Sequence, residues 1–422
     1  MSALPPGLLP DNATVGDDGR LLIGGCDVAE LANEFGTPLF IYDEDHLRAR
    51  CREAMAAFGG NVVYATKAFL CLAMARLVAE EGMGFDVASG GELHVALAGG
   101  ADPARTVLHG NNKSVAELRA ALDAGVGRIM VDSFDELDRL EKLAADTGRT
   151  PNVYLRVTPG VEAHTHHYTA TGQIDSKFGF GIPAGDAARA VERAAASENV
   201  ELVGVHMHIG SQIFVADSFA KAVQVLGEFF NPLGLGELSI GGGLGVAYVE
   251  GETSESITAW GERVRQGCRD AGIDAQVWAE PGRAIAASAA VTVYEVGTIK
   301  EIPGTRTYVA VDGGMIDNPR PALYGSGYET FLPRAVTAER DKTVTVVGKH
   351  CESGDVLVRD ALVPSDLTVG DLLATPVTGA YGHSMGSNYN KLARPAVVFA
   401  RDGDARLVVR RESLEDLLRN DV

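Results

Sequence analysis

The chain lacks several features that mark specialised classes of protein. Its five cysteines are scattered, odd in number and without CxxC spacing, which argues against a disulfide framework or a thiolate zinc site and favours a reducing compartment. No uncharged apolar run is long enough to span a bilayer, and the N-terminus lacks a basic region followed by an apolar core. These absences predict a cytoplasmic protein with no membrane partner.

Positive charge is also scarce. There are 37 Lys and Arg against 57 Asp and Glu, a formal net charge of -20, so a nucleic-acid backbone is not an expected partner. The hydrophobic content of 46% with mixed charges is typical of a soluble globular protein. The length of 422 residues suggests two domains, and 50 glycines predict many tight turns or close ligand approaches.

Short apolar runs alternate with helical patterns through the middle of the chain. The strand-like runs are Val62–Thr66, Gly84–Ala88, Thr106–Leu108, Arg128–Val131, Val153–Val157, Val203–His208, Leu238–Ile240 and Gln276–Glu280. Eight strands, each followed by a helix or a crossover, predict a (β/α)8 barrel of the TIM type. A doubly wound open sheet is the alternative that periodicity leaves open.

Polar residues at the strand ends favour the barrel, because the carboxyl ends of barrel strands converge on one mouth. Lys67, His109, His208 and Glu280 stand at such ends. Beyond residue 288 the sequence becomes β-rich and partly alternating, which predicts an antiparallel β domain. The predicted domains are an N-terminal segment, 1–36, that joins the β domain, a barrel, 37–288, and a C-terminal β domain, 289–422.

Two charged residues at strand ends indicate the chemistry. Lys67 follows Val62–Thr66 and Glu280 follows Gln276–Ala279, so both are expected to be buried, which is rare for Lys and Glu without a partner or a task. A lysine that can bond to an aldehyde and a carboxylate that can pin a ring nitrogen are what pyridoxal phosphate (PLP) requires. Gly241–Gly243 fits neither nucleotide-binding spacing, and either an ordinary turn or a phosphate site would explain it.

Two further patterns are weak. Several histidines could in principle bind a metal: His164, His166, His167, His206 and His208. No carboxylate or thiolate is interleaved at ligand spacing, so no metal site is predicted. Gly382–Gly386 fits the GxSxG nucleophile elbow around Ser384, yet no histidine follows His383 to complete the triad order, and we interpret the match as chance.

A set of short motifs occurs in one order along the chain. They are Tyr64–Ala68, Ser89–Leu93, His109–Ser114, Ser176–Phe180, His206–Gln212, Gly241–Gly243, Glu280–Arg283, Val311–Met315, Cys351–Asp355 and Gly379–Gly382. Each motif alone is weak, but the ordered set, over about residues 37–395, resembles the diaminopimelate decarboxylase family of fold-type III PLP-dependent decarboxylases.

The resemblance implies a PLP-binding barrel with a β domain, and a homodimer with active sites at the subunit interface. It implies decarboxylation of meso-2,6-diaminopimelate to L-lysine and CO2, the last step of lysine biosynthesis. The alternatives are a related decarboxylase acting on another amino acid, such as D-lysine, D-ornithine or a carrier-bound substrate, and a catalytically silent PLP-binding regulatory homologue.

The resemblance also implies residue roles. Lys67 would hold the cofactor covalently, His208 would stack on its ring, Glu280 would face the ring nitrogen, and Cys351 of the partner subunit would be the proton donor. The groups around the phosphate would be Ser211, Gly242, Gly243, Gly282, Arg283 and Tyr381. The substrate would be held by Arg283, Arg320, Tyr324, Glu352 and Tyr381. Departures from the family pattern at His167, His383 and 391–395 are expected to affect substrate preference more than the reaction.

Overall fold

A computed structural model describes residues 4–160 and 176–422. The chain forms two compact units, and each unit combines segments that are distant in sequence. One unit consists of Met1–Ala49, Ala247–Thr253 and Ile285–Val422, and the other of Arg50–Val246 and Ser254–Ala284.

The unit built from 50–246 and 254–284 is a parallel β barrel. Its strands follow one another in the order β13-β12-β11-β9-β8-β7-β6-β5. Val62 pairs in parallel with Ala279, and the Val63 N–H donates to the Ala279 carbonyl at 3.0 Å, which joins the last strand to the first. The sequence prediction of a closed (β/α)8 barrel is therefore confirmed, and the open sheet is excluded.

The barrel strands are short and lie close to the predicted runs. They are β5 (Val63–Ala65), β6 (Gly84–Val87), β7 (Thr106–Leu108), β8 (Arg128–Val131), β9 (Asn152–Thr158), β11 (Glu201–His206), β12 (Glu237–Ser239) and β13 (Gln276–Trp278), with β10 (Phe180–Gly181) beside β9. Apolar side chains from these strands, including Val107, Met130 and Trp278, form a buried core cluster, as expected for strands covered on both faces.

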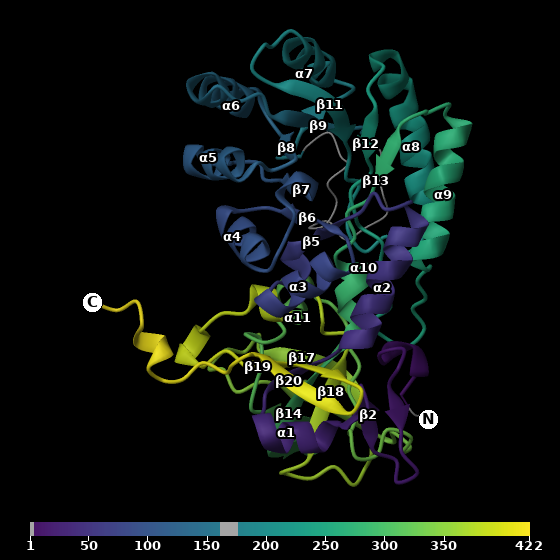
Figure 1. Ribbon diagram of the computed structural model, residues 1–422. Helices are drawn as coiled ribbons and strands as arrows, with labels where there is room; N and C mark the ends of the chain where they lie inside the picture. Colours follow the sequence, from purple (N-terminus) through teal and green to yellow (C-terminus); the bar gives the residue numbers. More distant parts are fainter. Residues whose placement is uncertain (1–3, 161–175) are drawn as a thin grey trace. The chain divides into compact units, whose positions relative to one another are not determined.

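Helices lie around the barrel strands, most of them in the connections between one strand and the next (Figure 1). They are α2 (Glu44–Ala57), α3 (Leu72–Glu80), α4 (Gly90–Ala98), α5 (Val115–Ala124), α6 (Phe134–Thr147), α7 (Asp186–Ala195), α8 (Asp217–Phe230), α9 (Ile257–Asp270) and the single turn α10 (Arg283–Ala286). Serine hydroxyls cap three successive helices, α4, α5 and α6, by accepting a backbone N–H of the first turn. These caps fix where each helix begins after its strand.

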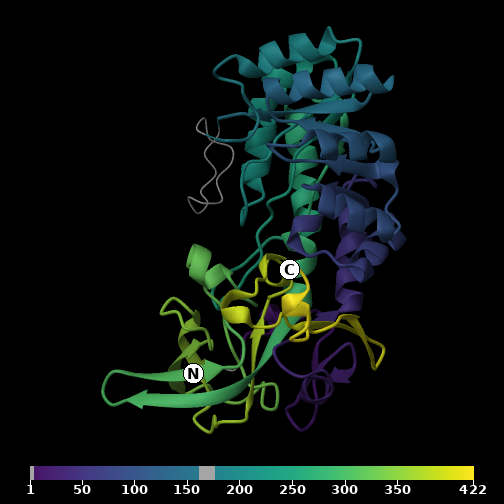
Figure 2. The same ribbon diagram turned by 90° about the vertical axis from the view of Figure 1, so that its left-hand side faces the viewer.

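The other unit is built on a mixed β sheet in the order β17-β16-β15-β14-β4-β19-β20, with β18 beside β14. Its strands are β4 (Leu39–Asp43), β14 (Ala290–Ile302), β15 (Arg306–Val311), β16 (Lys342–Val347), β17 (Val356–Val363), β18 (Leu372–Pro376), β19 (Ala396–Arg401) and β20 (Asp404–Val409). Most neighbours are antiparallel, as predicted, but β15–β16 and β4–β19 are parallel. Figure 2 shows the long ribbon of β14 and β15.

The N-terminal segment joins this β-rich unit, as predicted. It contains β1 (Thr14–Val15), β2 (Leu21–Ile23), β3 (Cys26–Asp27) and α1 (Val28–Phe35). The Leu21 N–H donates to the Pro333 carbonyl at 2.8 Å, and the Val336 N–H donates to Gly19 at 3.1 Å. These backbone bonds tie the start of the chain to its last third.

One strand differs from its predicted place. The sequence assigned β4 to the barrel range 37–288, but β4 pairs with β14 and β19 in the β-rich unit. All five of its residues are buried, so both faces of the sheet are covered at this strand. As a division into folding domains, the ranges 1–36, 37–288 and 289–422 stay a prediction.

The GxSxG match does not form a nucleophile elbow. His383–Met385 is a 3-10 turn that β18 precedes by several residues, and the next element is another 3-10 turn, Tyr389–Lys391. The strand before and the helix after the serine, which an elbow needs, are both missing from this described stretch. The interpretation as a chance match agrees with this geometry.

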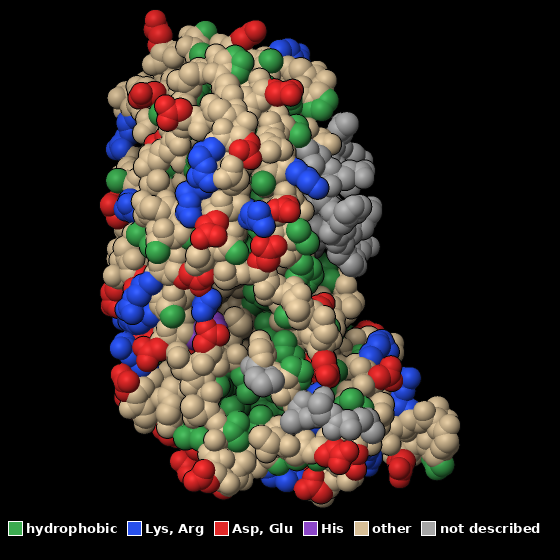
Figure 3. All heavy atoms as spheres, turned by 90° about the vertical axis from the view of Figure 1, so that its right-hand side faces the viewer, with side chains coloured by type: hydrophobic (Ala, Val, Ile, Leu, Met, Phe, Trp, Pro, Cys, Tyr) green, Lys and Arg blue, Asp and Glu red, His purple; other side chains and the backbone are tan. Residues whose placement is uncertain are grey.

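The surface reflects the composition. Basic and acidic side chains are interspersed over the face shown in Figure 3. Among residues 4–160 and 176–422, no helix combines the length and the apolar character that crossing a bilayer requires.

Candidate active site

Polar and ionisable side chains gather where the barrel strands end. Asp86 lies near the end of β6, His109 directly follows β7, His206 ends β11, Ser239 ends β12, and Glu280 lies two residues beyond β13. The barrel closes β13 onto β5, so strands far apart in sequence bring these groups together. All five residues are buried. Such a cluster at the carboxyl ends of barrel strands is where an active site is expected.

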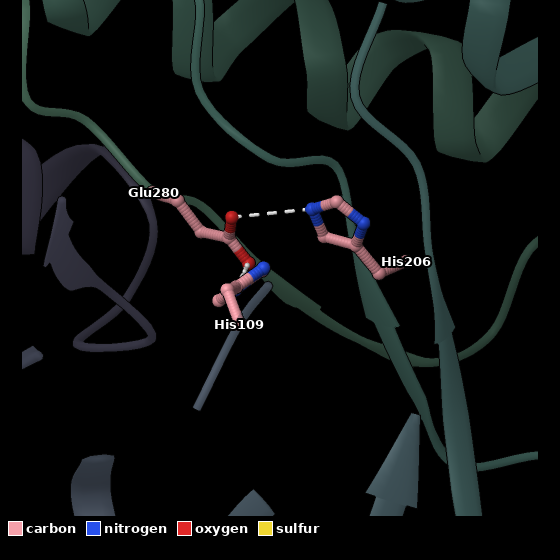
Figure 4. Close-up of side chains that lie close together, drawn as sticks. All are labelled: His109, His206 and Glu280. Atoms are coloured by element: carbon pink, nitrogen blue, oxygen red, sulfur yellow. Dashed lines mark hydrogen bonds and ion pairs between the residues drawn. The ribbon is translucent and has the colours of Figure 1, made fainter. Parts of the chain in front are cut away.

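The carboxylate of Glu280 is the centre of this cluster (Figure 4). Its Oε2 lies 3.2 Å from Nε2 of His206, and its Oε1 lies 3.4 Å from Nε2 of His109. The Ser239 hydroxyl donates to Oε1 at 2.7 Å. Nε2 of His109 is also 3.6 Å from Asp86 Oδ1. Both oxygens of Glu280 are thus fixed in position by neighbouring side chains.

The electrostatics keep Glu280 charged. Burial alone would raise the pKa of Glu280, but His206 and His109 beside its oxygens hold that pKa well below its usual range. Burial lowers the pKa of His206 to about 4, so its ring is neutral at pH 7. Burial opposes charge on His109 too, yet Asp86 and Glu280 raise the pKa of His109 above its ordinary value. The cluster presents a buried carboxylate that stays ionised.

A glycine run packs against His208 and Glu280. A Cβ added at Gly241 would lie 2.9 Å from Nδ1 of His208, and one at Gly242 would lie 2.2 Å from the Glu280 carbonyl oxygen. Gly243 has φ +117°, and its Cβ would meet the Gly210 carbonyl at 2.1 Å. Only glycine fits these positions, which explains the run noted in the sequence. Burial and the neighbouring charge of Lys67 lower the pKa of His208 well below its ordinary value.

A cation lies next to this glycine run. Arg283, at the start of α10, donates from Nη2 to the hydroxyl of Ser211 at 3.0 Å. Ser211 follows His208 and Gly210 in the loop after β11, and Gly210 contacts the Gly243 position. A buried guanidinium, a hydroxyl and a glycine turn form a suitable donor set for a phosphate group.

Lys67 differs from its prediction in one respect. It lies on the 3-10 turn Thr66–Ala68 after β5 and is exposed, although it was expected to be buried. The turn buries its neighbours Thr66 and Ala68 but leaves Lys67 exposed. The charge of Lys67 still acts on His208 and His109, so the lysine lies near the polar cluster. Gly282 packs on this turn, with its added Cβ 2.9 Å from the Ala65 carbonyl. The stretch around Glu280 and the Lys67 turn therefore lie side by side.

The remaining predicted residues belong to the β-rich unit. Cys351 and Glu352 are exposed in the loop between β16 and β17. Arg320, on α11 (Arg320–Tyr324), is buried, donates to the Tyr328 hydroxyl at 2.6 Å and stacks over Tyr248 at 4.1 Å. Tyr324, on the same helix, and Tyr381 are half-buried.

Residues that the sequence could not place together include Asp86, His109, Ser239 and Glu280. The only signal for Asp86 is a charged residue within the apolar run Gly84–Ala88. His109, His206 and Glu280 bring possible ligand atoms within 4.8 Å of one another, a closeness that sequence spacing does not show.

Other histidines were also noted in the sequence. His164, His166 and His167 lie outside the described residues. His383, noted as a departure, is buried edge-on against Phe40, with a ring separation of 5.8 Å.

Comparisons with known proteins agree with this geometry. Residues 44–287 match the family described as "Pyridoxal-dependent decarboxylase, pyridoxal binding domain". Diaminopimelate decarboxylase of Mycobacterium tuberculosis is 46% identical over 98% of this chain and 98% of its own length. The enzyme of the same name from Bacillus subtilis is 46% identical over 96% and 95% of the two chains. Diaminopimelate decarboxylase from M. jannaschii, solved with L-lysine, has a TM-score of 0.91 at 33% identity and covers 98% of both chains.

The barrel residues fit pyridoxal phosphate. An ionised, buried carboxylate can face a protonated ring nitrogen, and an exposed lysine can bond to an aldehyde. The turn around Gly242 and Gly243 leaves no room for a Cβ but exposes backbone to a phosphate, with Arg283 close by. The residues needed at the two ends of the cofactor are thus present within one unit.

Proposed function

Because this chain belongs to the pyridoxal-dependent decarboxylases, we propose that it decarboxylates meso-2,6-diaminopimelate to L-lysine and CO2. The observation that carries the proposal is the buried carboxylate of Glu280, fixed by His206, His109 and Ser239 at the carboxyl ends of the barrel strands. Relatives 46% identical over nearly the whole chain bear the name of this activity.

The barrel residues have separate tasks in this proposal. Bound PLP supplies an electron sink for the pair that CO2 leaves behind on Cα. Glu280, ionised, keeps a proton on the ring nitrogen, which a neutral or cationic residue would not do. Lys67 would hold the cofactor covalently, and His208 would lie against its ring. Ser211, Gly242, Gly243, Gly282 and Arg283, together with Tyr381, bind the phosphate.

The substrate needs groups of both charges. Diaminopimelate carries a carboxylate and an ammonium at its far end. We assign Arg283 and Arg320 to carboxylates, because the guanidinium fork binds them bidentately. Glu352 pairs with the ammonium, and Tyr324 and Tyr381 complete the contacts. The Cys351 thiol returns a proton to Cα after CO2 leaves.

The assembly and location are part of the same proposal. The family resemblance supports a cytoplasmic homodimer in which each active site takes Cys351 of the partner subunit. The exposure of Cys351 and Glu352 is consistent with such a role.

The direct test measures CO2 and L-lysine release from meso-diaminopimelate by the purified protein with added PLP. D-lysine, D-ornithine and L-ornithine serve as competing substrates. We expect turnover of diaminopimelate alone. Turnover of one of the others alone would keep the decarboxylase chemistry and reject the substrate.

A covalent test addresses the lysine independently. After borohydride reduction, the wild-type protein should retain PLP on the peptide containing Lys67, and Lys67→Ala should retain none. Covalent retention in the variant would show that a different lysine holds the cofactor.

A further inference from the structure

The loop that carries Cys351 is fixed by residues that the proposed function leaves without a task. Gly348–Asp355 connects β16 to β17 and presents Cys351 and Glu352 at the surface. The Asp355 carboxylate at the end of this loop is only 3% exposed. A carboxylate this deeply buried, in the same loop as an exposed thiol, calls for a partner or a task.

Asp355 accepts three hydrogen bonds from the surrounding chain. The Met315 N–H donates to Oδ1 at 2.7 Å. The His350 N–H donates to Oδ2 at 2.9 Å, and Nδ1 of the same histidine lies 2.8 Å from Oδ2. This carboxylate therefore fixes both the backbone and the side chain of the residue that precedes Cys351.

Glycines make this close approach possible. A Cβ added at Gly314 would lie 2.5 Å from Nδ1 of His350 and 2.7 Å from either oxygen of Asp355. A Cβ at Gly348 would lie 2.2 Å from Asp355 Oδ2. The motif Val311–Met315 and the motif Cys351–Asp355, more than thirty residues apart in sequence, thus form one structural element.

A third segment holds the thiol residue itself. The Cys351 N–H donates to Oδ1 of Asn390 at 2.9 Å. Asn390 has φ +53°, a left-handed conformation in which Asn, Asp and Gly are favoured. The adjacent Tyr389 ring is parallel to the His350 ring, with 6° between the planes and 5.9 Å between the centroids. Residues on both sides of the Cys351 amide are therefore anchored to the same segment.

We infer that Asp355 and Asn390 are positioning residues that fix the Cys351 thiol for proton transfer, with His350 as the connecting group. The inference rests on the proposed function, because it assigns these residues a purpose only if Cys351 donates a proton. A small displacement of a reacting group lowers a rate strongly while ground-state binding changes little. The loop is held at a backbone amide rather than at the thiol, which leaves the sulfur unobstructed.

The test uses variants matched at one position of the full-length enzyme. Asn390→Gly removes the acceptor but tolerates the left-handed backbone, and Asn390→Asp keeps both the acceptor and that tolerance. We expect Asn390→Gly to lower kcat about tenfold and to leave the Kd for PLP within about twofold of wild type. Asn390→Asp should restore most of the lost turnover. Asn388→Gly is the control for a general increase in the flexibility of this segment. The Asn388 side chain donates to Leu392 and Glu412 and not to the Cys351 loop.

Hydrogen exchange and mixed dimers distinguish positioning from general damage. Exchange at the Cys351 amide should rise in Asn390→Gly and not in Asn388→Gly. Mixing Asn390→Gly with Lys67→Ala chains should create one fully competent site per mixed dimer, whereas mixing it with Cys351→Ala should not. Equal recovery in the two mixtures, or faster exchange without loss of kcat, would overturn the inference.

Failure of the proposed function gives a different pattern. Wild-type protein would then release no CO2 from diaminopimelate, whatever the exchange rates of the variants.

Asp355→Asn should lower kcat more than Asn390→Gly, by about 100-fold, with PLP still bound. If Asp355→Asn fails to fold, the exposed Asn390 position still decides the inference.

Discussion

The two ends of the barrel hold charged clusters that are built differently. At the amino ends of β8 and β12, the first residues of both strands, Arg128 and Glu237, form a bidentate pair at 2.6 and 2.5 Å. The Tyr154 hydroxyl donates to Glu237 at 2.5 Å, and the guanidinium lies 4.6 Å from the Trp278 ring centroid. One cation and one anion are matched, and their opposite charges offset each other within the pair.

At the carboxyl ends, charge is not matched in this way. Glu280 and Asp86 face two histidines, of which His206 is held neutral and only His109 has a raised pKa. Perturbed pKa values of this kind are typical of functional sites, where groups are arranged for chemistry rather than for stability. One barrel thus separates a stabilising ion pair from a reactive carboxylate by placing them at opposite strand ends.

The strongest test of this separation replaces the reactive carboxylate. Glu280→Gln should lower kcat/KM by about 100- to 1,000-fold, because the neutral amide no longer keeps a proton on the ring nitrogen. The free energy of unfolding should change by less than about 1 kcal/mol, since the variant also removes a buried charge. Decarboxylation assays and urea unfolding measure the two effects. A large loss of stability with activity retained would reverse our assignment of the two ends.

The matching change at the amino end should have the opposite profile. Glu237→Gln leaves Arg128 without its ionic partner and should lower the free energy of unfolding by about 2–3 kcal/mol. The value of kcat/KM should stay within about twofold of wild type. Urea unfolding of both proteins gives the difference. If Glu237→Gln impaired catalysis as strongly as Glu280→Gln, the two ends would not be functionally separate.

Acid should affect the carboxyl end first. The folded pKa of His206 is lowered to about 4, so the unfolded chain binds more protons between pH 6.5 and 4, and stability falls as the pH drops through that window. Burial also lowers the pKa values of His208 and His383, which add to the loss. The pKa of His109 is raised, so its contribution to stability is fully present below pH 6.5 and is lost only as the pH rises above this window. Glu280, with its lowered pKa, loses its contribution only below this window.

A variant isolates the His206 contribution. Between pH 6.5 and 5, wild type should lose about 2 kcal/mol more stability than His206→Gln, because the buried imidazole must be kept neutral. Urea unfolding across this pH range measures the difference. If the free energy of unfolding depended on pH identically in the two proteins, His206 would not be held neutral. The Arg128–Glu237 pair should contribute no pH dependence in this range.

The barrel was readable from sequence because its signals are local. The strands Thr106–Leu108 and Arg128–Val131 were predicted with their observed bounds, since each apolar run ends at polar or turn-forming residues. Lys67 and Glu280 were found in the same way, from charged residues at strand ends. These features depend on a few neighbouring residues and on the rule that barrel strands point to one mouth.

Features that depend on long-range pairing were missed. β18 is hard to recognise locally, because Leu372–Pro376 is short and a proline, which argues against a strand, stands at its last position. The membership of β4 follows from its pairing with β14, about 250 residues later, which no local pattern shows. The approach of His109 to Glu280 likewise needs the closed barrel, so the sequence could name both residues but not their contact.

The smallest expected effects come from removing one hydroxyl at each end of the barrel. The two variants are matched, because each loses a single oxygen atom. Ser239→Ala removes the donor to Glu280 Oε1 and the acceptor of the Gly241 N–H. It should raise the Kd for PLP and lower kcat/KM about fivefold each. Tyr154→Phe removes the donor to Glu237 and should lower the free energy of unfolding by about 1 kcal/mol, with PLP binding unchanged. Titration with PLP and urea unfolding of both variants measure the Kd and the free energy of unfolding. A hydroxyl at the amino end that altered PLP binding would show that the two clusters are coupled through the barrel interior, and the separation between them would then be incomplete.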